Sequence, residues 1–572
     1  MRNYRFYPSW LHSLFVIALI LGICFRFANL DGKVYWFDET YTSMRVAGYT
    51  EAEVIQQLSF NQEIGIKDLQ KYQRISPEKD LTDTLNSLRV EDPQHPPLYY
   101  ILNWFWARSF GNSVAVTRSL TALLSLLVFP CIYWLCWELF ELALVGWIAM
   151  ALIAVSPLHV ALAQDAREYC LWTVTTLLSS AALLRAIRIK TYHSWGIYAV
   201  TVAVGLYTFL LSGLVILGHA IYTFTTVGFR SSKTVVAYCL ALLAGIFSFL
   251  PWLLVVVAGI NQIRMTTQWS TNKTSLLFLV KQQAAFLSWI FFDPGFRAGD
   301  RLEYLMIPSA IILPLLVGYA VYFLGRRAKK QSYFFILTLA STVTLPLLVP
   351  DFLLGGHRSG IRYLIPFYLC IHLTIAYLLA IQISAISVKI WRQRQWQIVM
   401  IVLFLSGILS CVIYTQSETW RNKYLSYYDP QIARIINHAA YPLLISDARV
   451  ADILPLSYLL DSKVRLRIKP QCYTSCLTDH FSTVNSSLLI KIPRGFSNIF
   501  VLRPSKDLLN QLKLEQSFKL EPAFNQPIGK GSLPTVLWEL KKKLEEQSLL
   551  ERLRYSSKLK NTENMWCMNG KK

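Results

Sequence analysis

An acidic pair, Asp38–Glu39, lies within the aromatic segment Tyr35–Tyr41. A carboxylate shielded by aromatic rings gains basicity, because desolvation disfavours its charged form, and it can then take a proton from a hydroxyl nucleophile. The competing interpretation is an aromatic belt at a membrane interface with two solvated carboxylates. The segment therefore predicts a general base, with a structural belt as the alternative.

Three further segments carry groups that complement a base. In the first, His95 precedes two prolines that restrict the backbone and fix the direction of the imidazole, and Tyr99 follows them. The other two are rich in arginine, whose guanidinium binds phosphate oxygens bidentately. Their candidate binding residues are Gln164, Asp165, Arg167, Tyr169, Arg358, Arg362 and Tyr363. The alternatives are a helix start at the prolines, an ion pair that caps a helix end, and arginines that snorkel to an interface.

The composition indicates that these segments belong to a membrane protein. Of 572 residues, 54% are hydrophobic and 16% charged, and the mean hydropathy is +0.38, which is too apolar for a soluble enzyme of this length. The net charge of +22 comes largely from basic clusters between apolar runs. That placement is typical of cytoplasmic turns, so it argues against a nucleic-acid partner.

Eleven apolar runs are long enough to be considered as membrane spans. The first follows Arg2 and Arg5 but has no small-residue cleavage site, so it predicts an uncleaved span and not a signal peptide. The runs are Leu11–Ala28, Val116–Trp137, Leu144–Ala163, Tyr169–Leu184, Gly196–Leu211, Gly213–Val227, Thr234–Ala258, Leu305–Leu324, Tyr333–Val349, Ile361–Ile383 and Ile398–Tyr414.

A cytoplasmic N-terminus accounts for four basic turns at once, because alternate threading places all of them inside. The basic residues are Arg185, Arg188, Lys190, Arg230, Lys233, Arg326, Arg327, Lys329, Lys330, Lys389, Arg392 and Arg394. The same threading places four segments on the outer face, together with everything after Tyr414: residues 29–115, the turn Gln164–Glu168, residues 259–303 and Pro350–Gly360. Within outer loop 29–115, Leu98–Phe110 is too short to span comfortably and predicts a helix in the interface. A hairpin of two spans would instead turn the basic clusters outward.

The part of the chain after the last run predicts a small extracytoplasmic α/β domain over residues 416–545, and a charged, disordered tail over 546–572. Its short strand-like runs are Tyr441–Ser446, Val464–Ile468, Ile499–Arg503, Ser517–Glu521 and Thr535–Leu540, with a helix over Ser505–Leu514. Cys472 and Cys476 could form a local disulfide in an oxidising compartment or remain unpaired thiols. Residues 1–415 form the predicted transmembrane domain.

The order of these motifs resembles the membrane glycosyltransferases of family 39, which include protein O-mannosyltransferases and bacterial aminoarabinose transferases of lipid A. The resemblance rests on Asp38-Glu39 after the first span, on the sequence from His95 to Tyr100, on that from Gln164 to Tyr169, and on Arg362-Tyr363. It covers residues 1 to about 415 in the order of elements. It implies the integral-membrane fold called GT-C, with about eleven or more transmembrane helices, and a sugar donor carried on a polyprenyl phosphate.

The resemblance also implies roles for individual residues. Asp38 would be the base that deprotonates the acceptor hydroxyl, and Glu39 its neighbour that tunes it or contacts substrate. His95, Arg167 and Arg362 would face the donor phosphate or sugar, and Tyr363 would pack there. Some relatives place a lysine where this chain has His95, which leaves the donor contact of the imidazole open at neutral pH.

The predicted reaction is a single in-line displacement at the anomeric carbon, with inversion, by a hexosyl- or pentosyltransferase on the non-cytoplasmic face. A divalent cation could supply part of the positive charge, but the outer segments contain no clear DxD-type motif, so no cofactor is assigned. The acceptor stays open among a protein hydroxyl, lipid A, a cell-wall polymer and another glycolipid. The partners expected are thus the lipid-linked donor, this acceptor and membrane lipids.

Two other functions compete with this prediction. A transporter or flippase of a lipid-linked saccharide needs polar groups along a path through the bilayer, whereas the runs here are apolar and the polar groups cluster at one face. A scaffolding membrane protein accounts for the tail but not for the outer carboxylates. The chain fits a multi-pass protein of the bacterial plasma membrane, with the endoplasmic reticulum as the alternative location.

Overall fold

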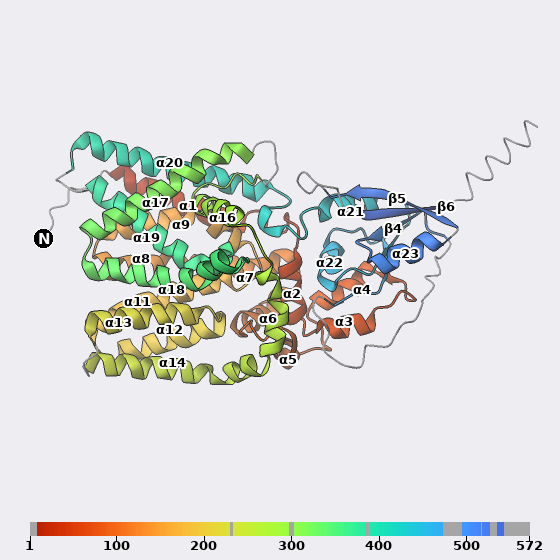
Figure 1. The fold of residues 1–572 in the computed structure, drawn as a ribbon, viewed down its shortest axis with the longest axis horizontal. Helices are drawn as coiled ribbons and strands as arrows, with labels where there is room; N and C mark the ends of the chain where they lie inside the picture. The colour runs from red at the N-terminus through yellow and green to blue at the C-terminus, as the bar shows by residue number, and fades with distance from the viewer. Residues whose placement is uncertain are drawn as a thin grey trace, which may run out of the picture. The chain divides into compact units, whose positions relative to one another are not determined.

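A computed structural model describes residues 9–228, 233–296, 303–384, 388–472, 495–515, 517–526 and 535–542. The described residues divide into two compact units. The membrane unit comprises residues up to Thr50 and from Tyr72 to Tyr427, and the second unit comprises Glu51–Lys71 and the described residues from Tyr428 onward. Figure 1 shows long helices in the membrane unit and a mixed sheet with short helices in the second unit.

Each of the eleven predicted runs is helical, and the long helices of the membrane unit lie roughly parallel (Figure 1). The helices in these runs are α1 (Ser9–Phe27), α7 (Val114–Leu126) with α8 (Val128–Phe140), α9 (Ala143–Ala154) with α10 (Pro157–Ala163), α11 (Tyr169–Ile189), α12 (Tyr192–Thr208), α13 (Ser212–Val227), α14 (Lys233–Ala258), α17 (Ile307–Arg327), α18 (Lys330–Leu354), α19 (Ile365–Ser384) and α20 (Ile390–Gln416). The prediction of a polytopic helical membrane protein is therefore confirmed.

Eight of the described spans are long and apolar enough to cross a membrane, or nine if the bent pair α9–α10 counts as one span. The remaining two predicted spans are the shorter helices α12, with 17 residues, and α13, with 16. A helix needs about 20 residues to cross the hydrocarbon region without tilt or thinning. The count of eleven thus depends on whether these two helices cross the bilayer.

The break between α9 and α10 bends the chain by 63°, and the sequence explains it. Pro157 is the first residue of α10, where a missing N–H is tolerated, but its ring prevents α9 from continuing. Arg26 of α1 is fully buried and donates to the carbonyls of Ala154 at 2.7 Å and Ile153 at 3.1 Å. Its guanidinium thereby donates to two carbonyls at the end of α9, beside the break.

Three short helices, α2 (Phe37–Val46), α5 (Leu81–Glu91) and α6 (Leu98–Phe110), contact one another and lie at one end of the long helices (Figure 1). The helix predicted over Leu98–Phe110 is confirmed with these bounds. Phe105 and Phe110 are exposed on it, whereas Tyr99 and Trp104 are buried. An exposed aromatic face suits an interface, and the position of α6 in the membrane stays a prediction.

The remaining helices of the membrane unit are short and lie between the long ones or after the last of them. They are α15 (Ile260–Thr266), α16 (Leu276–Trp289) and the 3-10 helices η2 (Gln268–Thr271), η3 (Glu303–Met306), η4 (Ile361–Leu364) and η5 (Arg421–Lys423). The 3-10 helix η1 (Lys71–Gln73) begins at the last residue of the segment Glu51–Lys71 of the second unit. The membrane unit encloses α11 and α19 most completely among its eight long apolar spans. These two helices begin at the end that carries α2, and each follows an arginine of the candidate site.

The second unit contains a six-stranded sheet in the order β1-β3-β2-β4-β6-β5. Strands β2, β3 and β4 are parallel, and Leu444 of β2 pairs with Leu466 and Phe500, whereas β1, β5 and β6 pair with antiparallel neighbours. The strands are β1 (Ile64–Gly65), β2 (Pro442–Ser446), β3 (Arg465–Ile468), β4 (Asn498–Leu502), β5 (Phe518–Asn525) and β6 (Thr535–Lys542). The helices of this unit are α3 (Glu51–Gln57), α4 (Ile66–Gln70), α21 (Asp429–His438), α22 (Val450–Ile453), η6 (Leu454–Tyr458) and α23 (Lys506–Leu514).

All five predicted strands and the predicted helix of the tail are present, with bounds that differ by a few residues. The sheet also includes a strand that the sequence did not reveal, because Ile64 and Gly65 of the first outer loop pair with Leu466 and Arg465. Two residues carry no periodicity that could mark a strand. Cys472 is disulfide-bonded, while Cys476 and the tail over 546–572 lie outside the described residues, so their predictions stay open.

Candidate active site

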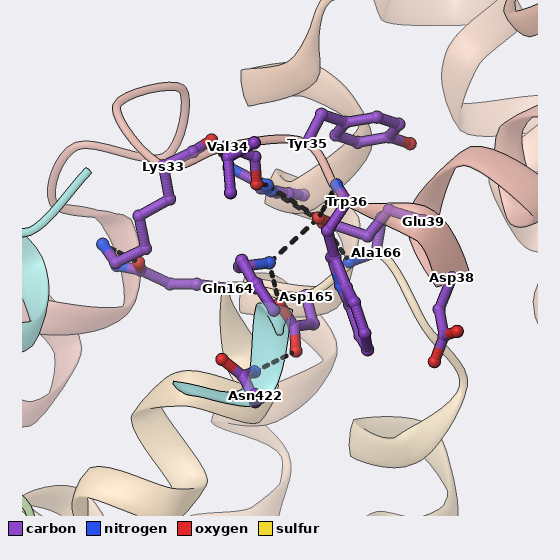
Figure 2. Close-up of polar contacts among 12 residues, drawn as sticks. Lys33, Val34, Tyr35, Trp36, Asp38, Glu39, Gln164, Asp165, Ala166 and Asn422 are labelled. Carbon is purple, nitrogen blue, oxygen red and sulfur yellow. Dashed lines mark hydrogen bonds and ion pairs between the residues drawn. The ribbon is translucent and has the colours of Figure 1, made fainter. Parts of the chain in front are cut away.

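The carboxylate of Glu39 is fully buried at the start of α2 and lies at the centre of a charged cluster (Figure 2). Arg118 of α7 holds it with two hydrogen bonds of 2.7 Å, one to each carboxylate oxygen. The backbone N–H of Ala166 donates to Oε1 at 2.9 Å, and that of Trp36 donates to Oε2 at 3.4 Å. A bidentate guanidinium and two amides satisfy a buried carboxylate, which fixes the start of α2 in place.

Lys423 of η5 connects Glu39 to a second buried carboxylate, that of Asp165. Its ammonium nitrogen lies 3.0 Å from Oε2 of Glu39 and 2.5 Å from Oδ1 of Asp165, and the side chain is completely buried. Asn422 donates to the other oxygen of Asp165 at 3.0 Å (Figure 2). Three separate parts of the chain, near residues 39, 165 and 423, therefore meet through buried charges.

The two carboxylates of this cluster respond differently to burial. Burial alone raises the pKa of Glu39, but the positive charges of Arg118 and Lys423 outweigh it and lower that pKa to about 2. For Asp165 burial is the largest influence, and the pKa is raised although Lys423 opposes the change. Glu39 is thus a permanent anion held by cations, and Asp165 is the member of the pair that depends on Lys423.

Lys33 and Gln164 form the margin of the same cluster (Figure 2). The ammonium of Lys33 donates to Oε1 of Gln164 at 3.0 Å, and the amide of Gln164 donates to the carbonyls of Phe25 and Ala28 at 2.6 and 2.9 Å. Burial, together with the nearby positive charges of Arg118 and Lys423, lowers the pKa of Lys33 to about 7. Gln164 therefore ties the segment after α1 to the turn before α11.

The side chain of Asp38 points away from the Glu39 cluster (Figure 2) and forms an ion pair with Arg362 of η4. Both side chains stay partly open, with 18% of Asp38 and 22% of Arg362 exposed. The guanidinium carbon of Arg362 lies 5.6 Å from the ring centre of Trp36, 5.7 Å from that of Tyr169 and 5.5 Å from that of Tyr363. Aromatic rings hold this cation beside the carboxylate while leaving it accessible.

Arg167 lies on the other side of Asp38 and contacts α2. One terminal nitrogen of its guanidinium donates to the carbonyl of Asp38 at 3.3 Å and to the hydroxyl of Thr42 at 2.9 Å. The other donates to Oε1 of Glu168 at 3.3 Å and lies 3.5 Å from Nε2 of His95. Its Nε is buried and has no hydrogen-bond partner among the described residues. A buried donor of this kind is available to a bound ligand.

His95 is oriented by Glu168, which was not among the predicted site residues. Its Nδ1 lies 3.0 Å from Oε1 of Glu168. Because a guanidinium only donates, Nε2 accepts from Arg167 and Nδ1 carries the proton, a tautomer assigned from these contacts. Although burial opposes it, the charge of Arg167 and the hydrogen bond from His95 lower the pKa of Glu168 to about 2.

Ion pairs between Arg45 of α2 and the end of α5 hold the segment that carries His95. Arg45 of α2 contacts Glu91 at 2.7 Å and Asp92 at 2.6 Å, and the carbonyl of Asp92 accepts from the backbone N–H of His95 at 2.9 Å. Burial raises the pKa of Asp92, but the charge of Arg45 outweighs it, so the net shift is downward. The imidazole therefore starts from a fixed backbone position.

Two predicted site residues make their contacts elsewhere. The hydroxyl of Tyr99 is buried within the helices and lies 2.8 Å from that of Thr121. The guanidinium of Arg358 contacts Asp351 at 3.1 Å and the carbonyl of Gly355 at 3.0 Å. The other predicted residues gather around Asp38 and Glu39: His95, Gln164, Asp165, Arg167, Tyr169, Arg362 and Tyr363.

Four members of the site were not among the residues predicted from the sequence: Lys33, Arg118, Glu168 and Lys423. Arg118 was detectable, since it is a charged residue inside an apolar run and such residues are expensive unless paired. Glu168 lies within the segment Gln164–Tyr169, in which other site residues were predicted. Lys423 had no signal, because it lies in a polar stretch after the last span, where lysine is common.

Each carboxylate at the centre of the site already contacts a cationic side chain. Glu39 and Asp165 already contact the cations Arg118 and Lys423, and Asp38 contacts Arg362. The part of the chain that the structure describes holds no group of three or more His, Cys, Asp or Glu side chains able to bind a metal ion. Mg²⁺ can be held by one or two carboxylates together with substrate phosphates, so a divalent cation stays a prediction.

Comparison with known proteins supports a glycosyltransferase fold. Residues 94–255, which include His95, Arg118 and Arg167, match the family model described as dolichyl-phosphate-mannose-protein mannosyltransferase. No curated protein sequence matches the chain.

Solved structures resemble the chain over nearly its whole length. ArnT from Cupriavidus metallidurans bound to undecaprenyl phosphate has a TM-score of 0.51 at 12% identity, over 93% of this chain and 98% of that one. Its apo state has a TM-score of 0.51 at 13% identity, over 93% and 97%. The oligosaccharyltransferase AglB from Archaeoglobus fulgidus, in complex with an inhibitory peptide and a dolichol-phosphate, has a TM-score of 0.50 at 11% identity, over 92% of this chain and 74% of that one. The chain therefore has the GT-C fold of integral-membrane glycosyltransferases, and its residues 94–255 are similar to the dolichyl-phosphate-mannose-protein mannosyltransferase family.

Proposed function

We propose that this protein transfers a sugar from a polyprenyl-phosphate donor to an acceptor hydroxyl on the non-cytoplasmic face of the membrane, with Asp38 as the general base. The observation that carries the proposal is the contact between Asp38 and Arg362, both partly exposed. It joins a carboxylate, a group that can accept a proton, to a guanidinium, a group that can bind phosphate. An inverting displacement needs both groups next to the anomeric carbon.

The charges around Asp38 suit a departing lipid phosphate. Arg362 and Arg167 both contact Asp38, one through its carboxylate and the other through its backbone carbonyl. Fixed positive charge beside the leaving oxygen stabilises the transition state, because it needs no reorganisation as negative charge develops. That ArnT binds undecaprenyl phosphate and AglB a dolichol-phosphate supports the same class of donor here.

The ion pair also gives an order to substrate binding. The donor phosphate competes for the guanidinium of Arg362, which frees an oxygen of Asp38 for the acceptor hydroxyl. Asp38 then takes the hydroxyl proton, the acceptor oxygen bonds to the anomeric carbon, and the bond from that carbon to the phosphate oxygen breaks with its electron pair on the phosphate. The configuration inverts because attack and departure are in line.

Ion pairs among the basic turns support the proposed membrane orientation. Arg188 at the end of α11 contacts Glu138 of α8 at 2.8 Å, and Lys329 contacts Glu141 at 3.0 Å. Two of the predicted cytoplasmic turns thus meet at the end of α8. With these turns inside, Asp38 faces the outer side, in a bacterial plasma membrane with a cytoplasmic N-terminus.

The test is transfer of radiolabelled sugar from a panel of polyprenyl-phosphate donors into membrane extracts. Wild type is compared with Asp38→Asn and with Asp31→Asn, the same chemical change at an exposed position. Label that disappears only with Asp38→Asn supports the proposal and identifies the acceptor by where it lands. Equal incorporation by a folded Asp38→Asn removes Asp38 as base, and no incorporation by wild type directs attention to a lipid-linked saccharide transporter.

A further inference from the structure

We propose that Lys423 is a positioning residue for the transfer reaction, acting on Asp38 and Arg167 through the two carboxylates that it joins. This inference rests on the proposed function. Lys423 lies seven residues beyond the end of α20 at Gln416, and its side chain is completely buried. Its ammonium is the one described cation that contacts both Glu39, at 3.0 Å, and Asp165, at 2.5 Å.

Three hydrogen bonds anchor the segment that carries Lys423 within the membrane unit. The backbone N–H of Val34 donates to the carbonyl of Glu418 at 2.8 Å. The indole of Trp420 donates to Asp293 at 3.1 Å, and the amide of Asn422 donates to Asp165 at 3.0 Å. The ammonium group therefore extends from a fixed backbone, which allows it to hold other groups in place.

The two carboxylates belong to the elements that bear the proposed reacting groups. Glu39 follows Asp38 on α2, and Asp165 precedes Arg167 by two residues. These elements also meet directly, through the N–H of Ala166 on Glu39 at 2.9 Å and through Arg167 on the carbonyl of Asp38 at 3.3 Å. Lys423 thus closes a ring of contacts that joins the start of α2 to the turn over Asp165–Arg167. A displacement of about 1 Å in such a ring can lower a rate about 100-fold.

Removal of Lys423 affects the two carboxylates unequally. Glu39 keeps both hydrogen bonds to Arg118. Asp165 keeps the amide of Asn422 but loses the cation on its other oxygen. A buried carboxylate without a cation must take up a proton or move toward water. A neutral residue at position 423 should therefore displace the turn over Asp165–Arg167.

The experiment compares wild type, Lys423→Met and the double variant Lys423→Met/Asp165→Asn, each purified as the full chain in detergent. The quantities measured are kcat and the KM for the donor identified by the panel, from pH 6 to 8.5. At pH 7.5 we expect Lys423→Met to lower kcat about 10- to 100-fold, with the donor KM changed less than about twofold because Arg362 keeps its own contacts. In the double variant no buried carboxylate is left without a cation, so kcat returns to within about threefold of wild type.

The pH profile separates positioning from a loss of folded protein. In Lys423→Met the kcat should rise as the pH falls toward 6, because protonated Asp165 no longer needs a cation, whereas a smaller folded fraction would leave the shape of the profile unchanged. If Lys423→Met does not fold, Lys423→Gln, whose amide can still donate to Asp165, carries the same pH test.

Three results would overturn the inference. A folded Lys423→Met with wild-type kcat removes the role of Lys423 while the proposed function stands. A double variant no faster than the single variant shows that Asp165 does not mediate the effect. Wild type that transfers sugar from no donor overturns the proposed function and the positioning role together, and the two failures are distinguished by the wild-type assay alone.

Discussion

Asp38 and Arg362 form an ion pair although 324 residues separate them in the chain. Asp38 follows the first span and Arg362 precedes α19. The site therefore forms only when these two distant segments of the membrane unit are folded together. The contact gives the aspartate a cationic partner before substrate arrives. A donor phosphate can replace the aspartate on that cation, which makes Arg362 the most informative residue to change.

Arg362→Gln should raise the donor KM and lower kcat/KM. A hydrogen bond to a charged group contributes ~1.5–3 kcal/mol, or roughly a 10- to 100-fold change in binding. Arg362→Lys should recover part of the loss, because it restores the charge but not the bidentate geometry. Steady-state kinetics over a range of donor concentrations provide the measurement.

Arg358→Gln is the matched control for that change. Arg358 contacts Asp351 and the carbonyl of Gly355, and not Asp38. We therefore expect an unchanged donor KM and a lower unfolding temperature, since Asp351 is buried and loses its cation. An equal rise of donor KM in both variants would argue against a specific phosphate contact at Arg362.

The neighbouring carboxylates of Asp38 and Glu39 should contribute differently to the free energy of unfolding. Glu39→Gln leaves Arg118 and Lys423 buried beside an uncharged amide, and breaking a buried ion pair costs about 3–5 kcal/mol. Asp38→Asn removes a partly exposed charge and should cost less than about 1 kcal/mol. Thermal unfolding of the two purified variants in the same detergent measures the difference. Equal unfolding temperatures would contradict the buried cluster.

The contribution of Glu39 to stability should be lost in acid. Its pKa is lowered from 4.5 to about 2 in the folded protein, so between these values the unfolded state binds more protons and stability falls as the pH falls. Above pH 4.5 the contribution is complete. The difference in unfolding temperature between wild type and Glu39→Gln should therefore shrink from pH 5 toward pH 3, and a difference independent of pH would refute the assignment.

Lys33, which is a cation and not an anion like Glu39, should make the stability depend on pH in the alkaline range. Its pKa is lowered from 10.5 to about 7, so between these values the unfolded state holds a proton that the folded state has released. Stability should therefore rise with pH across this window. Replacement by Met removes the ionisable group, and the unfolding temperature of Lys33→Met should rise less between pH 7 and 9 than that of wild type. Parallel curves would show that Lys33 is solvated.

Local sequence determined the elements of this protein. Long apolar runs favour helices because every backbone polar group must be satisfied within the segment in lipid, and alternating short runs in the tail favour strands. Leu98–Phe110 was predicted to the residue because Pro97 and Gly111 bound it. The four polar segments were equally visible, since charged residues at a membrane edge contrast with the apolar runs around them.

Only the tertiary structure decided what each polar residue does. The sequence presents Asp38 and Glu39 as equivalent neighbours, but consecutive residues of a helix point in different directions, so one is buried with Arg118 and Lys423 and the other lies partly open beside Arg362. The same holds for Arg358, whose partner is Asp351, and for Ile64, which joins a sheet formed mainly by the tail. These outcomes depend on which distant groups share a desolvated space, and that is a property of packing and not of any local pattern.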